Sequence, residues 1–462
     1  MTVPTARVTA DLLAKYDRPG PRYTSYPTAV EFHDGFTAAD YEEHLTLANE
    51  AADEPLSLYV HLPFCESKCA FCGCTALVSR NEDVPTRYVE AVRTELAMLA
   101  ERLPDRRRLG QYHWGGGTPT HLTPAQMRRL QAGLAEHFTF DDDAEVAVEV
   151  DPRETTDEDV DVLRELGFNR ISMGVQDLDD AVQEAIGRGQ SEALTRRLYD
   201  RARAAGFDSV NLDLVYGLPK QTPETFRRTI EAIVEMRPDR LAVYSYAHIP
   251  WIKSNQRRID EADLPPREVK LELFGIAMEQ FLTAGYAQIG MDHFALPRDE
   301  LALAADAGTL HRNFMGYTVK SGTDMLGVGL SAIGDVRGAF AQNAKELADY
   351  HAAVDAGRLP IVKGYRLVGE DALRRHVITS LMCNFTLDVA DTERRFDIDF
   401  AETFAPEIAQ LRVAEAEEFV TVTPDRIDVK PIGRLFVRNV GMVFDAHRKD
   451  RDTGRPMFSR TV

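Results

Sequence analysis

The feature that most constrains the fold is a regular alternation of two hydrophobic patterns between residues 55 and 295. One pattern has a period of two residues, as in a strand, and the other recurs every three to four residues, as in a helix. Strands are predicted at 56–62, 111–114, 145–150, 170–175, 209–217 and 240–249. Helices are predicted at 85–103, from 123 onward, at 157–168, in two stretches before 206, at 222–236 and at 267–286. This order predicts an α/β fold with a parallel sheet and helical crossovers, and its six units favour a complete or incomplete barrel.

The cysteines are distributed unevenly. Four of the five lie within ten residues, at positions 65, 69, 72 and 74, whereas Cys383 stands alone in an apolar helical segment. Thiolates this close can converge on one metal centre. Three interpretations compete: an iron–sulfur cluster held by Cys65, Cys69 and Cys72 with one iron left open, a four-thiolate zinc site, or a pair of disulfides.

Composition and charge narrow these interpretations. No stretch of the 462 residues is long and apolar enough to cross a membrane, and the N-terminal segment lacks a signal-peptide pattern. We therefore expect a cytoplasmic, reducing location, where clustered cysteines bind metal more often than they pair. The net charge of −20 and the lack of a long basic run argue against nucleic-acid binding. Nothing points to an oligomer, so a monomer is expected.

The chemically unusual residues follow the predicted strands. The cysteine loop follows the first strand, and Gly115–Gly117 follow the second. Later strand ends carry Glu149 and Asp151, Gln176 and Asp177, Asp213, and the segment 246–248. In a parallel barrel all these points lie on the C-terminal rim, where active sites are built. Their joint position next to the cysteines therefore predicts an active site.

The predicted domains follow from this pattern. Residues 1–50 are expected to form an N-terminal arm covering the active site, and 51–295 the barrel. Residues 296–369 are rich in glycine and predict a loop-rich extension and linker. Residues 370–462 predict a mostly helical, winged-helix-like domain with a hairpin at 419–431 and a final helix. Because this domain is not strongly basic, a lid is favoured over a DNA-binding role.

At these positions the sequence resembles the radical S-adenosylmethionine (radical SAM) enzymes, whose signature is C-x-x-x-C-x-x-C after the first barrel strand. Here it reads CESKCAFC, from Cys65 to Cys72. Further motifs resemble the oxygen-independent coproporphyrinogen III oxidase family, and the resemblance covers almost the whole chain. They are RYTSYPT, SLYVHLPFC, CGC, HWGGGTPT, EVDPRE, NRISMGVQD, NLDLVYGLPKQTPE, MDHFALP and HRNFMGYT.

The resemblance implies a fold, cofactors and a reaction. It implies the incomplete (β/α)6-type barrel of radical SAM enzymes and a 4Fe–4S cluster bound by Cys65, Cys69 and Cys72. The open iron would bind SAM, and a second SAM is implied beside the first. A 5′-deoxyadenosyl radical would then start decarboxylation of two propionates of coproporphyrinogen III, giving protoporphyrinogen IX. A low-potential electron donor and a final electron acceptor are implied as partners.

The resemblance also implies roles for individual residues. Gly116 and Gly117 would let the backbone approach SAM, and Glu149 would accept hydrogen bonds from ribose hydroxyls. Tyr59 is expected to face the cluster, with a catalytic and cofactor-binding role. The remaining positions implied in SAM binding are Phe71, Thr118, Gln176, Arg188, Asp213, Ala247 and, for one of the two molecules, Ile333.

The fourth clustered cysteine and the substrate contacts are further hypotheses. Cys74 is expected to act in catalysis, and its presence favours an enzyme over the related haem-binding chaperones, which are the alternative. The four carboxylates of the substrate require local cations on an acidic protein. The candidates for these cations are Arg22, Arg312 and Lys220.

Overall fold

The structure is a computed structural model that describes residues 8–320, 322–448 and 458–461. Its centre is a twelve-stranded sheet. The parallel strands that follow one another in the chain are β1 (Leu56–Leu62), β2 (Arg108–Gly116), β3 (Thr139–Val150), β4 (Arg170–Gln176), β5 (Ser209–Tyr216) and β6 (Arg240–Ser245). Beyond β6 the sheet continues with two short antiparallel strands, β8 (His293–Ala295) and β7 (Ala287–Ile289).

The other edge of the sheet is built by a segment that the sequence did not predict as strands. There, β11 (Met325–Val328) pairs in parallel with β1, and β12 (Ile333–Val336), β13 (Ala339–Asn343) and β14 (Ile361–Arg366) follow as antiparallel strands. The full order is β14-β13-β12-β11-β1-β2-β3-β4-β5-β6-β8-β7. The prediction of a loop-rich segment was therefore wrong for 325–343.

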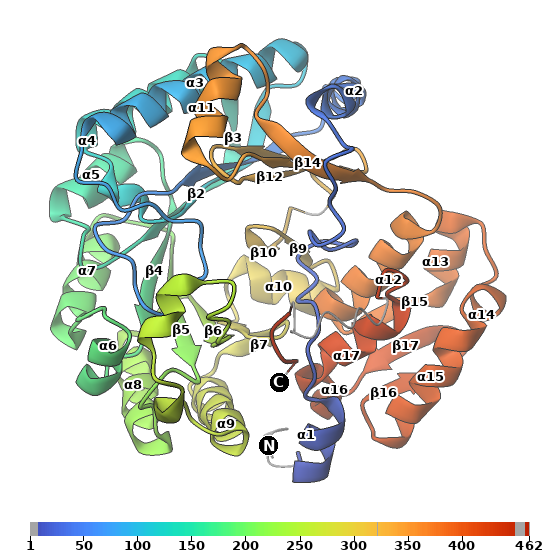
Figure 1. Cartoon of the computed structure of the whole chain (residues 1–462). Coiled ribbons are helices and arrows are strands. Elements are labelled where there is room, and N and C mark those ends of the chain that lie inside the picture. Colours follow the sequence, from blue (N-terminus) through green and yellow to red (C-terminus); the bar gives the residue numbers. More distant parts are fainter. Residues whose placement is uncertain (1–7, 321, 449–457, 462) are drawn as a thin grey trace.

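Helices cover the outer face of the parallel strands (Figure 1). They are α3 (Asp83–Arg102), α4 (Pro124–Ala135), α5 (Asp157–Glu165), α6 (Asp180–Ala185), α7 (Glu192–Ala204), α8 (Pro223–Met236) and α9 (Arg267–Thr283). The predicted start of α4 is confirmed, because Thr123 and Gln126 form a capping box. On the inner side of the sheet lie α10 (Glu300–Ala307) and the short pair β9 (His311–Asn313) and β10 (Gly316–Thr318), whose Leu301 and Tyr317 line a cavity (Figure 1). α11 (Leu347–Asp355) packs beside α3, and three 3-10 turns complete this part of the chain: η2 (Pro119–His121), η3 (Ser254–Arg258) and η4 (Glu261–Asp263).

The C-terminal part forms a second packed unit beside the sheet (Figure 1). It contains α12 (Asp371–Asn384), β15 (Thr386–Asp388), α13 (Val389–Phe396), α14 (Phe400–Thr403), α15 (Ala405–Ala416), β16 (Val420–Val422), β17 (Arg426–Val429), α16 (Pro431–Leu435), α17 (Val437–Gly441) and η5 (Met442–Phe444). The predicted hairpin is confirmed as β16 and β17, to which β15 adds a third strand. The predicted single final helix is instead broken at Phe436, whose φ of −110° and ψ of 18° leave the helical range.

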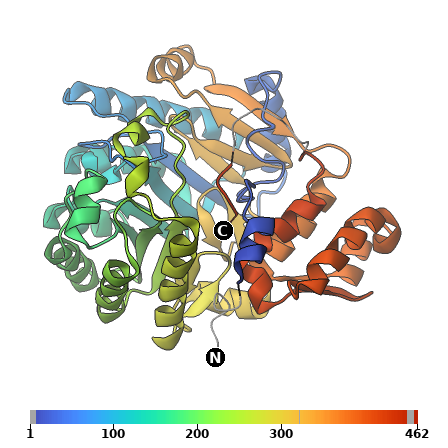
Figure 2. The ribbon, with the colours of Figure 1, turned by 60° about the horizontal axis from the view of Figure 1, so that its bottom comes forward.

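The N-terminal segment joins these two units. Its helix α1 (Ala10–Tyr16) lies beside α16 and α17, and the chain then runs between the units to α2 (Ala38–Asn49) (Figures 1 and 2). Tyr23 and Tyr26 belong to the hydrophobic core of the C-terminal unit. The N-terminal segment therefore packs against the C-terminal unit.

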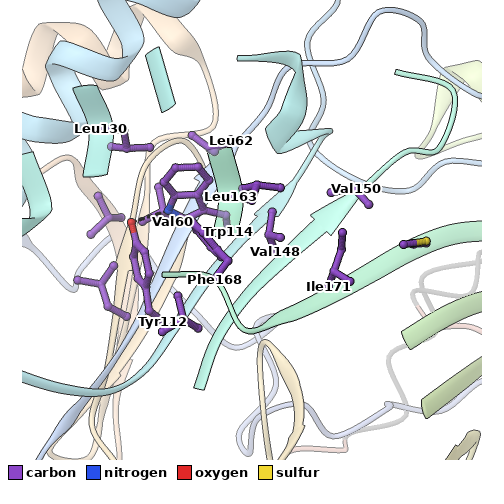
Figure 3. Packing of buried hydrophobic residues seen from close by; sticks show 14 of the residues in the cluster. Val60, Leu62, Tyr112, Trp114, Leu130, Val148, Val150, Leu163, Phe168 and Ile171 are labelled. Carbon is purple, nitrogen blue, oxygen red and sulfur yellow. Dashed lines mark hydrogen bonds between the residues drawn. The ribbon is translucent and has the colours of Figure 1, made fainter. Parts of the chain in front are cut away.

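The two faces of the parallel strands differ sharply in character. Outward side chains such as Val60, Trp114 and Val148 pack under the helices with Leu130 and Phe168 (Figure 3). On β1 the alternate residues Leu56, Leu58, Val60 and Leu62 are fully buried on this outer face, in keeping with the period of two that predicted the strand. The opposite face carries polar side chains, which line an interior cavity of about 120 Å³. Because side chains alternate between the two faces of a strand, the polar side chains of these strands face the inner side of the curved sheet.

The predicted bounds of three strands need correction. The strand predicted to extend to residue 249 ends at Ser245, and the following segment folds as loop and 3-10 turns. The strands predicted at 111–114 and 145–150 are longer, running from Arg108 and Thr139. Strand pairing with neighbours extends them through polar residues that carry no hydrophobic alternation.

Candidate active site

The cysteine loop leaves the C-terminal end of β1 and is held by its backbone. The Cys65 N–H donates to Leu77 O at 3.1 Å, and the Ala70 N–H donates to Ile186 O at 2.8 Å. The Asn255 side-chain amide lies 3.1, 3.1 and 2.9 Å from the carbonyl oxygens of Cys69, Ala70 and Cys72. These contacts hold the loop at the end of β1.

Cations surround the sulfur of Cys69. One guanidinium nitrogen each of Arg153 and Arg188 lies 3.6 Å from Cys69 Sγ. Both arginines also pair with Asp151, at 2.7 and 3.1 Å. Positive charge next to a sulfur favours its thiolate form, which is the form that binds metal.

The other sulfurs have weaker donors beside them. The Thr118 hydroxyl lies 3.7 Å from Cys65 Sγ, and the Cys74 N–H lies 3.4 Å from Cys72 Sγ. A hydrogen bond from the Cys74 thiol is the main cause that lowers the pKa of Cys72 to about 6. All five cysteines are free thiols, so the disulfide interpretation finds no support in the structure.

The residues present fit an iron–sulfur cluster better than a single ion. Among the described residues, no three Cys, His, Asp or Glu side chains converge closely enough to hold one metal ion, as a zinc site requires. The ligands of a four-iron cluster bind different irons, so three soft thiolates spread along one loop suit it. Cys65, Cys69 and Cys72 are those thiolates, with the nearby arginines offsetting their charge.

The glycines after β2 are required by the packing of the protein itself. A Cβ added to Gly117 would lie 2.5 Å from Phe64 O, and one added to Gly116 would lie 2.5 Å from the His61 ring. The Gly117 N–H donates to Leu62 O at 2.8 Å, and the Thr118 N–H to Phe64 O at 2.7 Å. The glycines thus fasten the end of β2 to the start of the cysteine loop.

A hydrogen-bond chain runs from Tyr59 toward the cysteines. The His61 Nε2 lies 2.9 Å from Thr75 O and must donate to it, so the Nδ1 accepts from the Tyr59 hydroxyl at 3.0 Å. Burial lowers the pKa of His61, which keeps the ring neutral and the chain intact. Tyr59 also stacks on His113, with ring centroids 5.8 Å apart.

Glu149 faces the interior cavity next to this chain. Its carboxylate lies 3.3 Å from His113 Nε2 and accepts from the Gly116 N–H at 3.1 Å. Burial opposes ionisation, but the hydrogen bonds outweigh it and lower the pKa of Glu149. Its side chain is 43% exposed because it lines the cavity. An ionised acceptor is therefore available there.

Asp213 lines the same cavity. It accepts from Ser172 at 3.1 Å and from Asn211 at 2.8 Å. Burial, followed by the negative charge of Glu149, raises the pKa of Asp213 to about 6. A cationic ligand group between these two carboxylates would relieve both effects.

The side chains of Gln176 and Arg188 both lie against Gly174, which has no Cβ to block them. A Cβ there would lie 2.7 Å from Gln176 Nε2 and 3.2 Å from Arg188 Nη2. The strand is irregular at this point, and Gln176 has a φ of 70°, in the left-handed region. Strain of this kind in a non-glycine residue is concentrated at functional sites.

The remaining predicted cofactor residues lie on the same rim. The carbonyl oxygens of Phe71 and Ala247 both accept from the Gln256 side chain, at 2.9 and 3.2 Å. Ile333 is brought next to β1 by the added strands, because its backbone lies against Gly327, which pairs with Tyr59. The structure therefore places all of these positions around one rim.

The three predicted substrate residues are not brought together. Arg22 forms an ion pair with Asp292, and Arg312 donates to the Arg22 carbonyl oxygen. Lys220 is exposed, and its N–H donates to Asp263 O at 2.8 Å. Arg22 and Arg312 thus form one group and Lys220 stands apart.

Sequence reasoning missed several residues that shape the site. Arg153 lies within the EVDPRE motif, so its position was a usable signal. Asn255 and Gln256, which hold the cysteine loop, come from a segment with no recognisable motif. His61 and His113 were visible only as polar positions on strands.

Comparison with known proteins places this arrangement in context. A family profile described as "Radical SAM superfamily" matches residues 59–233, and one described as "HemN C-terminal domain" matches 367–436. The oxygen-independent coproporphyrinogen III oxidase of Escherichia coli (strain K12) is 45% identical over 451 residues, covering 98% of each chain. The enzyme of that name from Synechocystis is 41% identical over 465 residues, covering 100% of this chain and 99% of its own.

A solved structure agrees with these relatives. The structure titled "Coproporphyrinogen III oxidase (HemN) from Escherichia coli is a Radical SAM enzyme" matches with a TM-score of 0.89 and 45% identity, covering 92% of this chain and 97% of its own. The predicted radical SAM fold is therefore confirmed. The chain belongs to the radical SAM superfamily and, within it, to the family of oxygen-independent coproporphyrinogen III oxidases.

Proposed function

We propose that this protein converts two propionate side chains of coproporphyrinogen III to vinyl groups without oxygen, giving protoporphyrinogen IX. Each conversion removes carbon dioxide, one hydrogen atom and one electron from a propionate. The observations that carry the proposal are the loop of Cys65, Cys69 and Cys72, held by Asn255 after β1, and the carboxylates of Glu149 and Asp213 in the interior cavity. Full-length relatives of that name support it.

The cluster cysteines have a defined task in this proposal. When bound, a 4Fe–4S cluster and SAM supply the one-electron chemistry that generates a 5′-deoxyadenosyl radical. Cys65, Cys69 and Cys72 hold the cluster. Arg153 and Arg188 offset the negative charge of the thiolates and hold the loop in place through Asp151. The protein supplies position and charge, and the cofactors supply the reactivity.

The polar rim residues would bind SAM, of which we propose two molecules. Glu149 would accept from ribose hydroxyls, and Asp213 would meet an amino group. Arg188 would hold a carboxylate, with Gln176 beside it. The backbone of Gly116, Gly117 and Thr118, together with Phe71, Ala247 and Ile333, would complete the walls.

Two further residues are proposed to act in turnover. Tyr59 would place its hydroxyl toward the reacting groups, with His61 as the acceptor that fixes its orientation. Cys74 lies at the end of the same loop. Because Cys65, Cys69 and Cys72 already supply three ligands, the Cys74 thiol is not needed for cluster binding. We assign Cys74 to catalysis and not to cluster binding.

No observation favours the alternatives. The full-length relatives carry the oxidase name, so a haem-binding chaperone is not favoured. Within the described residues, no helix is long and apolar enough to cross a membrane. An electron donor and a final acceptor remain proposed partners, because the reaction must be supplied with one electron and must dispose of another.

The test is anaerobic reconstitution of the protein with iron, sulfide, a reductant and SAM. Methionine, 5′-deoxyadenosine and protoporphyrinogen IX are measured with and without coproporphyrinogen III. We expect iron and sulfide in a four-to-four ratio, and about two SAM consumed for each product molecule, since two propionates react. Cluster assembly and SAM cleavage without any protoporphyrinogen would refute the proposed substrate.

A further inference from the structure

A small pocket at the junction of the two units carries an excess of positive charge. It is lined by residues of the N-terminal arm, the ends of β5 and β6, helices α16 and α17, and the C-terminal segment 458–461. Four arginines line it, at positions 22, 434, 438 and 460, against one aspartate, Asp292. This is unusual on a protein with a net charge of −20.

Two of the four arginines already have carboxylate partners. Arg22 pairs with Asp292, and Arg460 pairs with Asp17 at 2.7 Å. Each of these pairs is neutral overall, and Asp292, the one acidic lining residue, is already the partner of Arg22. An anion in the pocket would therefore be attracted by the other two arginines.

Arg438 is buried and charged without a carboxylate. Its side chain is 5% exposed and donates to the carbonyl oxygens of Pro21 at 3.0 Å and Arg460 at 2.6 Å, and to those of Gly20 and Ser459. Carbonyl dipoles solvate the guanidinium but do not cancel its charge. Burial, with repulsion from Arg22, lowers the pKa of Arg438 to about 9, as expected where positive charge is in excess.

Arg434 is the least satisfied of the four. Within the described part of the chain its Nε is buried without a hydrogen-bond partner, and no ion pair reaches its guanidinium. Its guanidinium carbon lies 4.4 Å from the centroid of the Phe385 ring. A buried donor without an acceptor is costly, so the site favours a ligand that supplies one.

The size and place of the pocket select the ligand. Its volume of about 40 Å³ suits a group of a few atoms, such as a carboxylate, and excludes a macrocycle. Tyr216 and Ser245, which pair across β5 and β6, form its floor. The Arg22 guanidinium of the pocket lies 5.8 Å from the centroid of the Tyr244 ring, and Tyr244 lines the interior cavity together with Asp213, so the pocket lies beside that cavity.

We propose that this pocket receives one carboxylate of the tetrapyrrole substrate, bound directly by Arg434, with Arg438 supplying positive potential behind it. The proposal rests on the proposed function and deepens it by assigning a substrate-recognition role to the C-terminal unit. A guanidinium binds a carboxylate through charge-assisted hydrogen bonds. Arg22, one of the predicted substrate residues, lines the same pocket and pairs with Asp292 in its wall.

The binding test uses the reconstituted protein and coproporphyrin III, the stable oxidised form of the substrate. Porphyrin fluorescence anisotropy gives the dissociation constant for wild type, Arg434→Gln, Arg434→Lys and the control Arg395→Gln. Arg395 is an exposed arginine of the same unit that also lies over a phenylalanine ring, at 5.7 Å. We expect Arg434→Gln to weaken binding by roughly 10- to 100-fold, with Arg434→Lys intermediate and the control unchanged.

The tetramethyl ester of coproporphyrin III separates recognition of a carboxylate from packing. Because the ester carries no charge, it should bind wild type and Arg434→Gln equally. Undiminished binding of the acid to Arg434→Gln would overturn the proposal, and so would an equal loss for acid and ester. If Arg434→Gln does not fold, the test uses the ratio of the dissociation constants of ester and acid for Arg434→Lys. A ratio equal to that of the wild-type protein would overturn the proposal.

Turnover distinguishes this inference from the proposed function. In Arg434→Gln we expect a raised KM with a nearly unchanged kcat, and normal iron content and SAM cleavage. A wild-type protein that makes no protoporphyrinogen IX would refute the proposed function. An active wild type together with an unchanged KM in Arg434→Gln would refute only the role of Arg434.

Discussion

Asn255 is predicted to control how firmly the protein retains its cluster. Its side-chain amide lies within 3.1 Å of the carbonyl oxygens of Cys69, Ala70 and Cys72. These bonds tie the loop that carries the cysteines to the turn η3. Replacing Asn255 with alanine removes them without touching any sulfur.

The size of the effect follows from the geometry. A side-chain amide has two N–H groups, so the three contacts amount to two full hydrogen bonds. Each hydrogen bond contributes about 0.5 to 1.5 kcal/mol, so Asn255→Ala should destabilise the ordered conformation of the loop by about 1 to 3 kcal/mol. If the ordered loop is the form that binds the cluster, retention should weaken by roughly 5- to 150-fold.

The assay is the loss of iron to an excess of chelator under anaerobic conditions, followed by absorbance. Ser254→Ala is the matched control, because Ser254 is the exposed neighbour of Asn255 and makes no side-chain hydrogen bond in the described structure. We expect Asn255→Ala to lose iron faster, and Ser254→Ala to behave as wild type. Equal rates for all three proteins would show that the loop does not depend on η3.

Three further predictions concern stability and the site. Burial raises the pKa of Glu95 to about 7 from its ordinary 4.5, so between these pH values the folded protein keeps a proton that the unfolded chain releases. The free energy of unfolding should therefore fall by about 3 kcal/mol as the pH rises from about 4.5 to 7. Urea unfolding of Glu95→Gln should lack this fall, whereas parallel pH profiles of the two proteins would contradict the shift. Cys74→Ser should keep its iron and lose turnover, and loss of iron would place Cys74 among the ligands. Gly117→Ala puts a Cβ 2.5 Å from Phe64 O and should lower both the iron content and the melting temperature. The control is Gly73→Ala, where a Cβ meets nothing within 4 Å. Equal iron content and melting temperature for the two variants would contradict the clash.

The central parallel strands could be predicted because their periodicity is strong and their neighbours are consecutive in the chain. The strands β11 to β13 could not, because they are only four to five residues long, and β11 and β12 contain glycine. Gly327 is such a residue: a Cβ there would lie 2.5 Å from the Ile333 carbonyl carbon. Glycine at this position marks close packing of strands, whereas in a sequence it predicts a loop.

The site was predictable where chemistry is concentrated at strand ends. Cys65, Cys69 and Cys72 could be placed because they follow a predictable strand, and Glu149 because it lies at the end of another. Asn255 could not, since amide groups that satisfy loop carbonyls have no sequence signature. For the same reason Arg434 looks like any surface arginine in sequence, and only its missing partner in three dimensions distinguishes it.

The cover over the site depends on contacts between the two ends of the chain. The Gly20 N–H donates to Ser459 O at 3.0 Å, and the Thr461 N–H donates to Arg18 O at 2.9 Å. Arg438 donates to carbonyl oxygens of both segments, so one buried cation holds the arm and the tail together. Chain ends open at a lower free-energy cost than a parallel sheet does. Parting these segments would therefore open the interior at a lower free-energy cost than separating the parallel strands, and a carboxylate bound by Arg434 would favour the closed arrangement that keeps water from the radical chemistry.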